Sequence, residues 1–506
     1  MDQPIVVVGS GFGGLAAAVR LRAQGHRVVL LEATDQHGGR AAVFRRDGYT
    51  FDAGPTVITA PYLLDELFTL VGRDPRDHYE LLPVDPFYRV VFPDGSQFDY
   101  VGDEERLLEQ IRRLSPQDVD GYLKLAARSR EIFDIGYTKL ADQPFDRLSD
   151  MLRVVPSMIR LRSDRTVWQM VCSHIQDHRL RQAFTFQPLL VGGSPLRTSS
   201  IYLLIHWLER KWGVWFPRGG TGALVQALVD LLDDLGVEVR TNSPVEEIEV
   251  ESGAAVAVRL GSGERIPCAG VVFNGDPSTA YGKLVAAKHR KVHTDRKIAR
   301  RTPSMSLFVT YVGTTRQFPD VAHHTILLGP RYEGLLDDLF VHKRLADDFS
   351  LYLHRPTASD PSLAPPGTDA LYVLSPVPND RSGIDWASRA SEYEDRILGA
   401  LDRGALPGLA TSTATKFSID PRYFGERLRS VDGAAFGLEP TLTQSAWFRY
   451  HNRSEDIDRL YFVGASTHPG AGVPGVLNSA RVLERVVPAP AVPEQLPTSK
   501  RARRSA

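Results

Sequence analysis

The sequence is poor in cysteine and has no excess of either charge. Its 506 residues include two cysteines, Cys172 and Cys268. Two are too few for a disulfide scaffold or an iron–sulfur cluster, and low cysteine content is typical of a reducing compartment. Sixty lysines and arginines against 61 aspartates and glutamates give a net charge of −1. No global basic field therefore favours nucleic acid as a partner.

Long hydrophobic runs and repeats are also missing. No uncharged apolar run approaches the ~18 residues that a membrane-spanning helix needs. The first expected strand starts at Pro4-Ile5, which leaves no room for a signal peptide. The lack of a fixed period disfavours solenoids and propellers. We therefore expect a cytoplasmic protein that is soluble or peripheral to the cell membrane.

Residues 4–33 have the pattern of a strand, a glycine-rich turn, a helix and a second strand. The turn fits G-x-G-x-x-G. Gly9 permits the tight turn, Gly11 lets the backbone approach a pyrophosphate, and Gly14 lets the helix pack closely on the sheet. The helix that starts near Phe12 points its N-terminal N–H groups at the phosphates. The pattern predicts a dinucleotide site.

The second strand ends in an acid, Glu32, 21 residues after Gly11. At this distance a carboxylate accepts hydrogen bonds from the adenosine ribose, and it disfavours the 2′-phosphate of NADP. The alternative is a glycine-rich turn with an ordinary exposed acid. Because a strand precedes the turn and a helix follows it, we prefer the dinucleotide site.

Two further glycine motifs follow, Gly38-Gly39-Arg40 and Gly54-Pro55-Thr56. The paired glycines open the backbone, and the arginine offers a fixed fork of donors for a phosphate or a carbonyl edge. At this offset from a dinucleotide fold the stretch resembles a group of flavoproteins that includes the amine oxidases. This resemblance implies FAD rather than NAD.

A second strand–turn–helix pattern covers residues 461–481, YFVGASTHPGAGVPGVLNSAR. The strand leads to Gly464, and the turn brings bare backbone near a planar ring. A helix is expected from about Gly475. Its N-terminus would place positive potential where a reduced flavin accumulates negative charge.

Together these motifs resemble the bacterial and fungal-type phytoene desaturases, which are FAD-dependent carotenoid desaturases of the flavin amine oxidase-like superfamily. The resemblance covers about residues 4–485 and includes the stretches 189–200, 212–227, 323–332, 350–366 and 435–448. It implies an oxidoreductase acting on CH–CH groups that desaturates 15-cis-phytoene stepwise, with cis–trans isomerisation, toward lycopene or neurosporene. The implied partners are phytoene, a membrane lipid surface, and a quinone or oxygen as electron acceptor.

The resemblance also implies roles for individual residues. Asp150 and Arg153 match a helical acid–arginine pair placed near the flavin in this family, with Glu439 as a second candidate for the base. Their spacing puts Asp150 and Arg153 on one helical face, so a plain surface ion pair is the alternative. The predicted cofactor contacts are Gly9, Gly11, Phe12, Gly14, Glu32, Gly38, Gly39, Arg40, Gly54, Pro55, Thr56, Val245, Gly464, Gly472, Val473 and Pro474.

We expect an α/β fold of two domains. One is a Rossmann-like FAD-binding domain of the two-dinucleotide-binding flavoprotein type, and the other is a mixed α+β domain that faces substrate and membrane. The FAD-binding domain is discontinuous, over residues 1–80, 215–275 and 430–490. The substrate-binding or lid domain takes residues 81–214 and 276–429. Residues 491–506, rich in proline and then basic, are expected to be a disordered tail.

Several alternatives stay open. The enzyme could desaturate a C30 or later C40 carotenoid, or it could be a carotene isomerase without net oxidation. A non-catalytic carrier of prenyl chains or lipids is a third possibility, which the intact glycine motifs disfavour. Segments 201–216 and 151–165 are both candidates for membrane contact. No metal site is expected, because His174 and His178 have helical ligand spacing but no third ligand.

Overall fold

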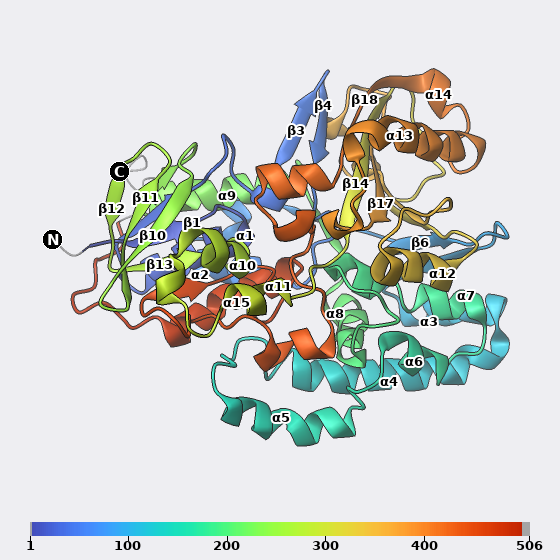
Figure 1. Cartoon of the computed structure of the whole chain (residues 1–506). Coiled ribbons are helices and arrows are strands. Elements are labelled where there is room, and N and C mark those ends of the chain that lie inside the picture. The colour runs from blue at the N-terminus through green and yellow to red at the C-terminus, as the bar shows by residue number, and fades with distance from the viewer. Residues whose placement is uncertain (1–2, 498–506) are drawn as a thin grey trace.

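A computed structural model describes residues 3–497 of the chain. A five-stranded parallel sheet lies at one end of the molecule (Figure 1). Its strands come from three distant parts of the chain. In spatial order they are β19 (Leu460–Phe462), β13 (Gly270–Phe273), β1 (Ile5–Val8), β2 (Val28–Leu31) and β9 (Glu238–Arg240).

Both faces of this sheet are covered, as the continuous β-branched run of β1 predicts. Because side chains alternate along a strand, Ile5 and Val7 point to one face and Val6 to the other. The first face packs against helices α1 (Phe12–Ala23), α2 (Tyr62–Thr69), α9 (Thr221–Asp234) and α15 (Val473–Val486). The second packs against an antiparallel sheet of β10 (Val245–Glu251), β11 (Ala254–Leu260) and β12 (Arg265–Pro267).

A seven-stranded mixed sheet forms the centre of the other half. Its strands are β18 (Thr413–Ile419), β14 (Ser306–Thr314), β17 (Ala370–Val377), β16 (Leu351–His354), β15 (His324–Leu327), β6 (Tyr88–Val91) and β7 (Gln97–Tyr100). Only the β15–β6 pair is parallel among these described strands. One face packs on α13 (Trp386–Arg403), and the other faces the largest apolar cluster.

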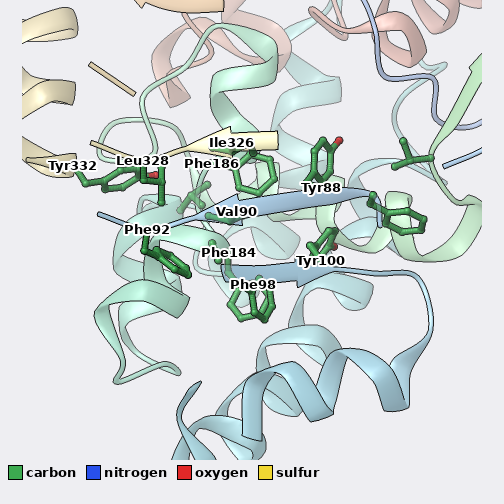
Figure 2. Close-up of a cluster of buried hydrophobic side chains, with 14 of the residues drawn as sticks. Tyr88, Val90, Phe92, Phe98, Tyr100, Phe184, Phe186, Ile326, Leu328 and Tyr332 are labelled. Carbon is green, nitrogen blue, oxygen red and sulfur yellow. The ribbon is translucent and has the colours of Figure 1, made fainter. Parts of the chain in front are cut away.

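That cluster is strongly aromatic where β6 and β7 meet the following helices. Figure 2 shows Tyr88 on β6 and Tyr100 on β7, with Phe184 and Phe186 from the segment that comes after α7. The rings of Tyr88 and Phe186 meet edge to face, with centroids 5.0 Å apart. The covering helices are α3 (Glu104–Leu114), α4 (Val119–Gly136), α6 (Val167–Cys172), α7 (His178–Ala183) and α8 (Leu204–Trp212).

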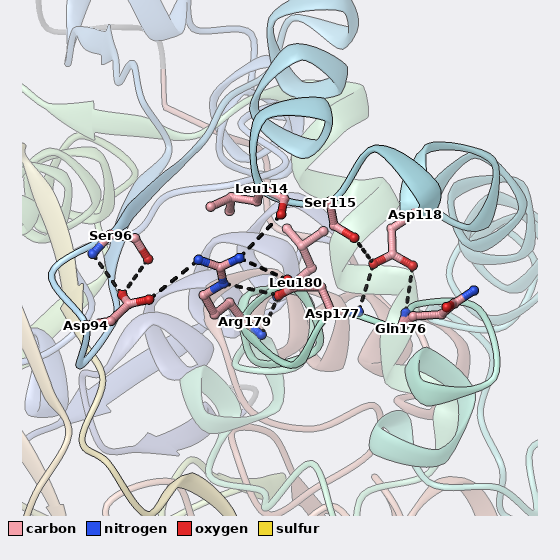
Figure 3. A network of polar contacts seen from close by, with 9 residues as sticks. All are labelled: Asp94, Ser96, Leu114, Ser115, Asp118, Gln176, Asp177, Arg179 and Leu180. Atoms are coloured by element: carbon pink, nitrogen blue, oxygen red, sulfur yellow. Dashed lines mark hydrogen bonds and ion pairs between the residues drawn. The ribbon is translucent and has the colours of Figure 1, made fainter.

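A buried carboxylate fixes this helical layer. Asp118, fully buried, accepts hydrogen bonds from Ser115 Oγ and from the backbone N–H groups of Gln176 and Asp177 (Figure 3). These bonds tie the start of α4 to the loop before α7. Arg179 extends the network by an ion pair with Asp177, 3.0 Å long.

The remaining elements are short or peripheral. Helix α5 (Leu148–Arg160) runs along the edge of the molecule, away from both sheets (Figure 1). The others are β3 (Val43–Arg46), β4 (Tyr49–Asp52), β5 (Leu81–Pro83), β8 (Trp215–Pro217), α10 (Pro277–Thr279), α11 (Asp295–Ala299), α12 (Tyr332–Asp337) and α14 (Leu409–Ser412). In the described range, residues 3–497, no helix combines the length and apolarity needed to cross a membrane.

The predicted α/β flavoprotein-type architecture agrees with these sheets, while the exact domain boundaries stay a prediction. The expected disorder of residues 491–506 is wrong at its start. Arg22 donates hydrogen bonds to the carbonyls of Glu494 and Gln495, and the N–H of Glu494 donates to Gly25. The chain is thus held against the end of α1, because a buried arginine there needs acceptors. The basic part of the expected tail, 498–506, lies outside the described residues.

Candidate active site

One cavity of about 580 Å³ lies between the five-stranded and the seven-stranded sheets. It is lined by residues from the first 60 positions, from the middle of the chain and from the last 45 positions. Gly14 is the one predicted cofactor contact that does not line it. Those that do are Gly9, Gly11, Phe12, Glu32, Gly38, Gly39, Arg40, Gly54, Pro55, Thr56, Val245, Gly464, Gly472, Val473 and Pro474.

The first glycine turn has the close approach that the sequence predicts. Gly9 has φ +97°, and α1 begins directly after Gly11. A Cβ on Gly14 would lie 1.9 Å from the carbonyl oxygen of Gly9. Gly14 therefore brings the helix against the turn, which explains its place outside the cavity wall. The sequence motifs did not predict Asn274 at this turn. Its Nδ2 donates to the Gly9 carbonyl at 3.2 Å.

Glu32 is buried, so the alternative of an ordinary exposed acid is wrong. Its Oε2 accepts from the N–H and the hydroxyl of Ser10, at 2.9 and 2.8 Å. Its Oε1 accepts from the N–H and the hydroxyl of Thr34, both at 2.9 Å. The two hydroxyl donors rotate freely, so the carboxylate can exchange them for ribose hydroxyls while it keeps both backbone bonds.

Arg40 joins the first and last parts of the predicted cofactor domain. Its Nε donates to the carbonyl of Ala435 at 2.5 Å, and its Nη2 donates to Ser430 Oγ at 2.8 Å. Burial lowers the pKa of the guanidinium, and the charge of Asp276 opposes that shift. A Cβ on Gly54 would lie 2.3 Å from the Arg40 carbonyl oxygen, so this turn also requires glycine.

The cavity wall suits a dinucleotide at this end. Two helices, α1 and α15, begin at its surface, each directly after a glycine, and their unpaired N–H groups and dipoles favour anionic groups. Helix α15 begins at Val473, two residues before the expected start. Gly38 has φ +106° and Gly472 has φ +88°, so the backbone lies bare at both positions.

The opposite end of the cavity is apolar. Its wall includes Met305, Leu307, Ile326, Leu328, Leu335, Leu336, Leu339 and Leu374, which belong to the seven-stranded sheet, α12 and neighbouring turns. Residues 201–208 also contribute, among them Ile201, Leu204 and Leu208. The 201–216 segment therefore covers the cavity from inside the molecule, which disfavours it as the membrane contact. The glycine turns and helix N-termini at one end of the cavity form a polar backbone cradle, and this cradle is continuous with an apolar space at the other end.

Comparison with known proteins identifies the family. The profile of the family described as flavin containing amine oxidoreductase matches residues 12–482. The lycopene-forming phytoene desaturase of Pseudescherichia vulneris is 50% identical over 479 residues, which cover 94% of this chain and 97% of that protein. The corresponding enzyme of Pantoea ananas is 48% identical over 480 residues, covering 95% and 98%. The chain belongs to this family, among its phytoene desaturases.

Membership of the family confirms the predicted flavin-dependent oxidoreductase with FAD as its cofactor. A neurosporene-forming phytoene desaturase of Rhodobacter capsulatus is 41% identical over 495 residues, covering 97% of this chain and 94% of that protein. Solved structures share the fold at low identity. An oxidoreductase from Methanosarcina mazei superposes with a TM-score of 0.65 at 17% identity, covering 96% of this chain and all of that one. Putrescine oxidase bound to putrescine gives 0.62 at 15% identity, covering 96% and 98%.

The acid–arginine pair that the family resemblance suggested does not reach the cavity in this phytoene desaturase. Asp150 and Arg153 lie on α5, where Arg153 Nη1 is 3.7 Å from Asp150 Oδ1 and the arginine side chain is 78% exposed. Neither residue lines the cavity. Spacing along a helix fixes which side chains share a face, but packing decides where that face points. The placement favours the alternative of a surface ion pair. Glu439, the second candidate, is buried against Arg197 at 2.8 Å and also lies outside the wall.

Other functional candidates were missed by sequence reasoning. Glu209, Tyr352 and Asp276 line the cavity. Glu209 had one detectable signal, since it is the single acid in the apolar and basic run 201–216. Tyr352 gave none, because aromatic residues are common in strands.

A buried histidine cluster, also unexpected, lies beside the cavity. His323, His324 and His354 have nitrogen atoms within 4.8 Å of one another. Tyr352 lies against the cluster, with its hydroxyl 2.6 Å from Nδ1 of His324. Burial lowers the pKa of His323 to about 3, and it lowers the pKa values of the other two as well. The three rings are therefore neutral at physiological pH.

Proposed function

We propose that this protein desaturates 15-cis-phytoene stepwise, toward lycopene or neurosporene, in carotenoid biosynthesis. The observation that carries the proposal is the single cavity in which a glycine-rich cradle for FAD continues into a hydrocarbon-lined space. Relatives of 41–50% identity carry the names of lycopene- and neurosporene-forming phytoene desaturases.

The protein's own task is to bind and orient a substrate without polar groups. FAD, when bound, supplies the two-electron oxidant for the C–H bond. Apolar walls such as Met305, Ile326 and Leu336 hold the chain by close packing and exclude water from the reacting carbons. The N-termini of α1 and α15 and the buried Glu32 hold the anionic and sugar parts of the cofactor.

The proposal is tested by incubating purified protein with FAD and phytoene in liposomes, under air or with a quinone. We expect a coloured polyene to form with matching consumption of the acceptor. Colour changes without acceptor reduction would instead indicate a carotene isomerase. Protein that binds no flavin and stays inactive after addition of FAD would contradict both enzymatic functions.

We further propose that α5 is the segment that contacts the membrane surface. Leu148, Leu152 and Ile159 on this helix are 55%, 62% and 69% exposed. Isolated exposed apolar side chains need no explanation, but three on one helix with no buried residue do. Residues 147–165 also contain five arginines and two aspartates, a net charge of +3 that favours anionic lipid.

The position of α5 supports this role. Leu140, Ala141 and Phe145, just before the helix, line the cavity. The turn 446–448, which packs against α5, begins at Ala446, another wall residue. Residues next to α5 in the chain and in space thus belong to the cavity wall, as a route for hydrocarbon from the bilayer would require.

Vesicle sedimentation tests the membrane contact. We expect Leu152→Asp and Ile159→Asp to reduce binding to vesicles containing anionic lipid. Val341→Asp is the matched control, because Val341 is 51% exposed elsewhere on the surface. Equal binding of all three variants would contradict the assignment.

A further inference from the structure

The cavity wall contains three carboxyl side chains in the described part of the chain, Glu32, Glu209 and Asp276. Two of them are fully engaged. Glu32 accepts from Ser10 and Thr34, and the two oxygens of Asp276 accept from the N–H of Ser278 and the hydroxyl of Ser466.

Glu209 differs from both. The residue is 1% exposed, and its Oε1 accepts a hydrogen bond from the hydroxyl of Tyr88 at 2.7 Å. Its Oε2 is buried and has no hydrogen-bond partner among the described residues. The side-chain amide of Gln187 lies close enough to lower the pKa of this carboxyl, but its Nε2 makes no hydrogen bond of ordinary geometry. A free carboxyl oxygen therefore belongs to a cavity wall that is otherwise largely apolar.

Among residues 3–497 no cation forms an ion pair with this carboxyl. Arg210, the next residue, extends toward Glu104 on the surface, 3.5 Å away. His206, one turn earlier, bonds through Nδ1 to the hydroxyl of Tyr100 at 2.8 Å. A buried carboxyl with one neutral donor costs stability. A structural role would be filled equally well by glutamine, which offers the same acceptor to Tyr88.

A series of side-chain contacts connects Glu209 with Thr56 on the cofactor side. The ring of its partner Tyr88 lies 5.6 Å from the ring of His324. Nδ1 of His324 is 2.6 Å from the hydroxyl of Tyr352, which in turn is 2.6 Å from Oγ1 of Thr56, a predicted cofactor contact. The series runs through Tyr88, His324 and Tyr352, which all belong to the seven-stranded sheet.

We propose that Glu209 is the base that accepts the proton lost by the substrate in each desaturation step. The assignment rests on the proposed function. FAD, when bound, would supply the two-electron oxidant that takes one hydrogen together with both electrons of its C–H bond. The neighbouring carbon gives a proton to the Glu209 carboxylate, and the electron pair of that bond becomes the new C=C bond. Glu209 then holds the proton as a neutral acid until solvent removes it.

The surroundings of Glu209 set the pH range of this step. Burial raises the pKa of its carboxyl to about 8, and the neighbouring side chains of Tyr88 and Gln187 oppose the rise. The groups that face it are Tyr88, Tyr100, His206 and Gln187, with Arg210 directed away. Burial lowers the pKa of His206 to about 3 and raises those of both tyrosines, so these groups stay neutral at physiological pH. A carboxylate base then requires turnover to rise with pH until about 8.

The decisive variant is Glu209→Gln in the FAD-loaded enzyme, with phytoene in liposomes. We expect kcat to fall by about 100-fold or more, while flavin content stays that of the wild type. Infrared spectra of the protein should lose one protonated-carboxyl band that disappears in the wild type near pH 8. Glu104→Gln, which removes a carboxylate 61% exposed beside the same helix, is the matched control.

A second variant decides the matter if Glu209→Gln binds no flavin. Tyr88→Phe removes the donor to Oε1, so the rise of kcat with pH should move to higher pH. Two outcomes would overturn the assignment of Glu209 without touching the proposed function. One is a pH profile of kcat in Tyr88→Phe that does not shift, and the other is a kcat of Glu209→Gln within about threefold of the active wild type. A flavin-loaded wild type that is inactive on phytoene overturns the proposed function and this assignment with it.

Discussion

The hydroxyl oxygen of Tyr352 lies 2.6 Å from Oγ1 of Thr56. Tyr352 belongs to β16 of the seven-stranded sheet, and Thr56 follows β4 in the turn predicted to contact the flavin. The bond therefore joins the hydrocarbon side of the cavity to the cofactor side. The same hydroxyl is also 2.6 Å from Nδ1 of His324.

Removing the hydroxyl of Tyr352 should lower the free energy of unfolding. Tyr352→Phe leaves a buried threonine hydroxyl and a buried imidazole nitrogen without this partner, which costs ~1–3 kcal/mol of unfolding free energy. A double-mutant cycle with Thr56→Val, measured by thermal unfolding, isolates the bond between the two hydroxyls. Strictly additive effects of the two variants would show that the bond contributes nothing.

The turn at Gly14 gives a second prediction. Gly14→Ala places a methyl group 1.9 Å from the Gly9 carbonyl oxygen, so α1 or the turn must move. We expect a loss of ~1–3 kcal/mol in stability and a lower flavin content in the purified protein. Gly282→Ala is the control, because a Cβ there meets nothing within 4 Å. If both variants bind FAD like the wild type, close packing at Gly14 is not required.

The network in Figure 3 gives a third prediction. Asp118→Ala removes a fully buried acceptor and leaves the part-buried backbone N–H groups of Gln176 and Asp177 without it. Each unpaired group costs ~1–3 kcal/mol, so denaturant unfolding should show a large loss. Asp120→Ala removes an exposed acid from the same helix end, and we expect at most ~1 kcal/mol there. Similar losses for both variants would contradict the role of Asp118.

The cofactor end of the site could be predicted because its signals are local. A strand, a glycine turn and a helix are contiguous in sequence, so the positions of Gly9, Gly11 and Glu32 follow from backbone rules. The C-terminal motif around Gly464 and Gly472 has the same character. The two motifs meet at one cavity because the parallel sheet places the carboxyl ends of β1 and β19 at the same edge.

The apolar end could not be predicted in the same way. Glu209 and Tyr352 are 143 residues apart, and only tertiary packing brings them to the wall of one cavity. Asp150 shows the opposite error. Its spacing from Arg153 was correct for an ion pair, but Arg153 is exposed and neither side chain lines the cavity.

One assay of two variants decides between Asp150, the base that the sequence suggested, and Glu209, the base that the structure suggests. We expect Glu209→Gln to lose far more turnover than Asp150→Asn, because only Glu209 lines the cavity. The readout is the initial rate of polyene formation per bound flavin, so that lost cofactor is not counted as lost chemistry. A larger loss at Asp150 would return the base to α5 and would require that helix to move over the cavity.

The raised pKa of Glu209 predicts how stability depends on pH. Below the ordinary value of 4.5 the carboxyl is protonated in both folded and unfolded chains. Between 4.5 and about 8 the unfolded chain releases the proton while the folded protein keeps it, so this group makes the wild type less stable as pH rises. Glutamine does not titrate. The advantage of Glu209→Gln in unfolding free energy should therefore grow from pH 4.5 to 8, by at most about 5 kcal/mol. Denaturant unfolding at pH 5 and pH 8.5 measures this difference in unfolding free energy, and Glu104→Gln is the control. An equal advantage of Glu209→Gln at both pH values would show that the folded carboxyl is already ionised at pH 5.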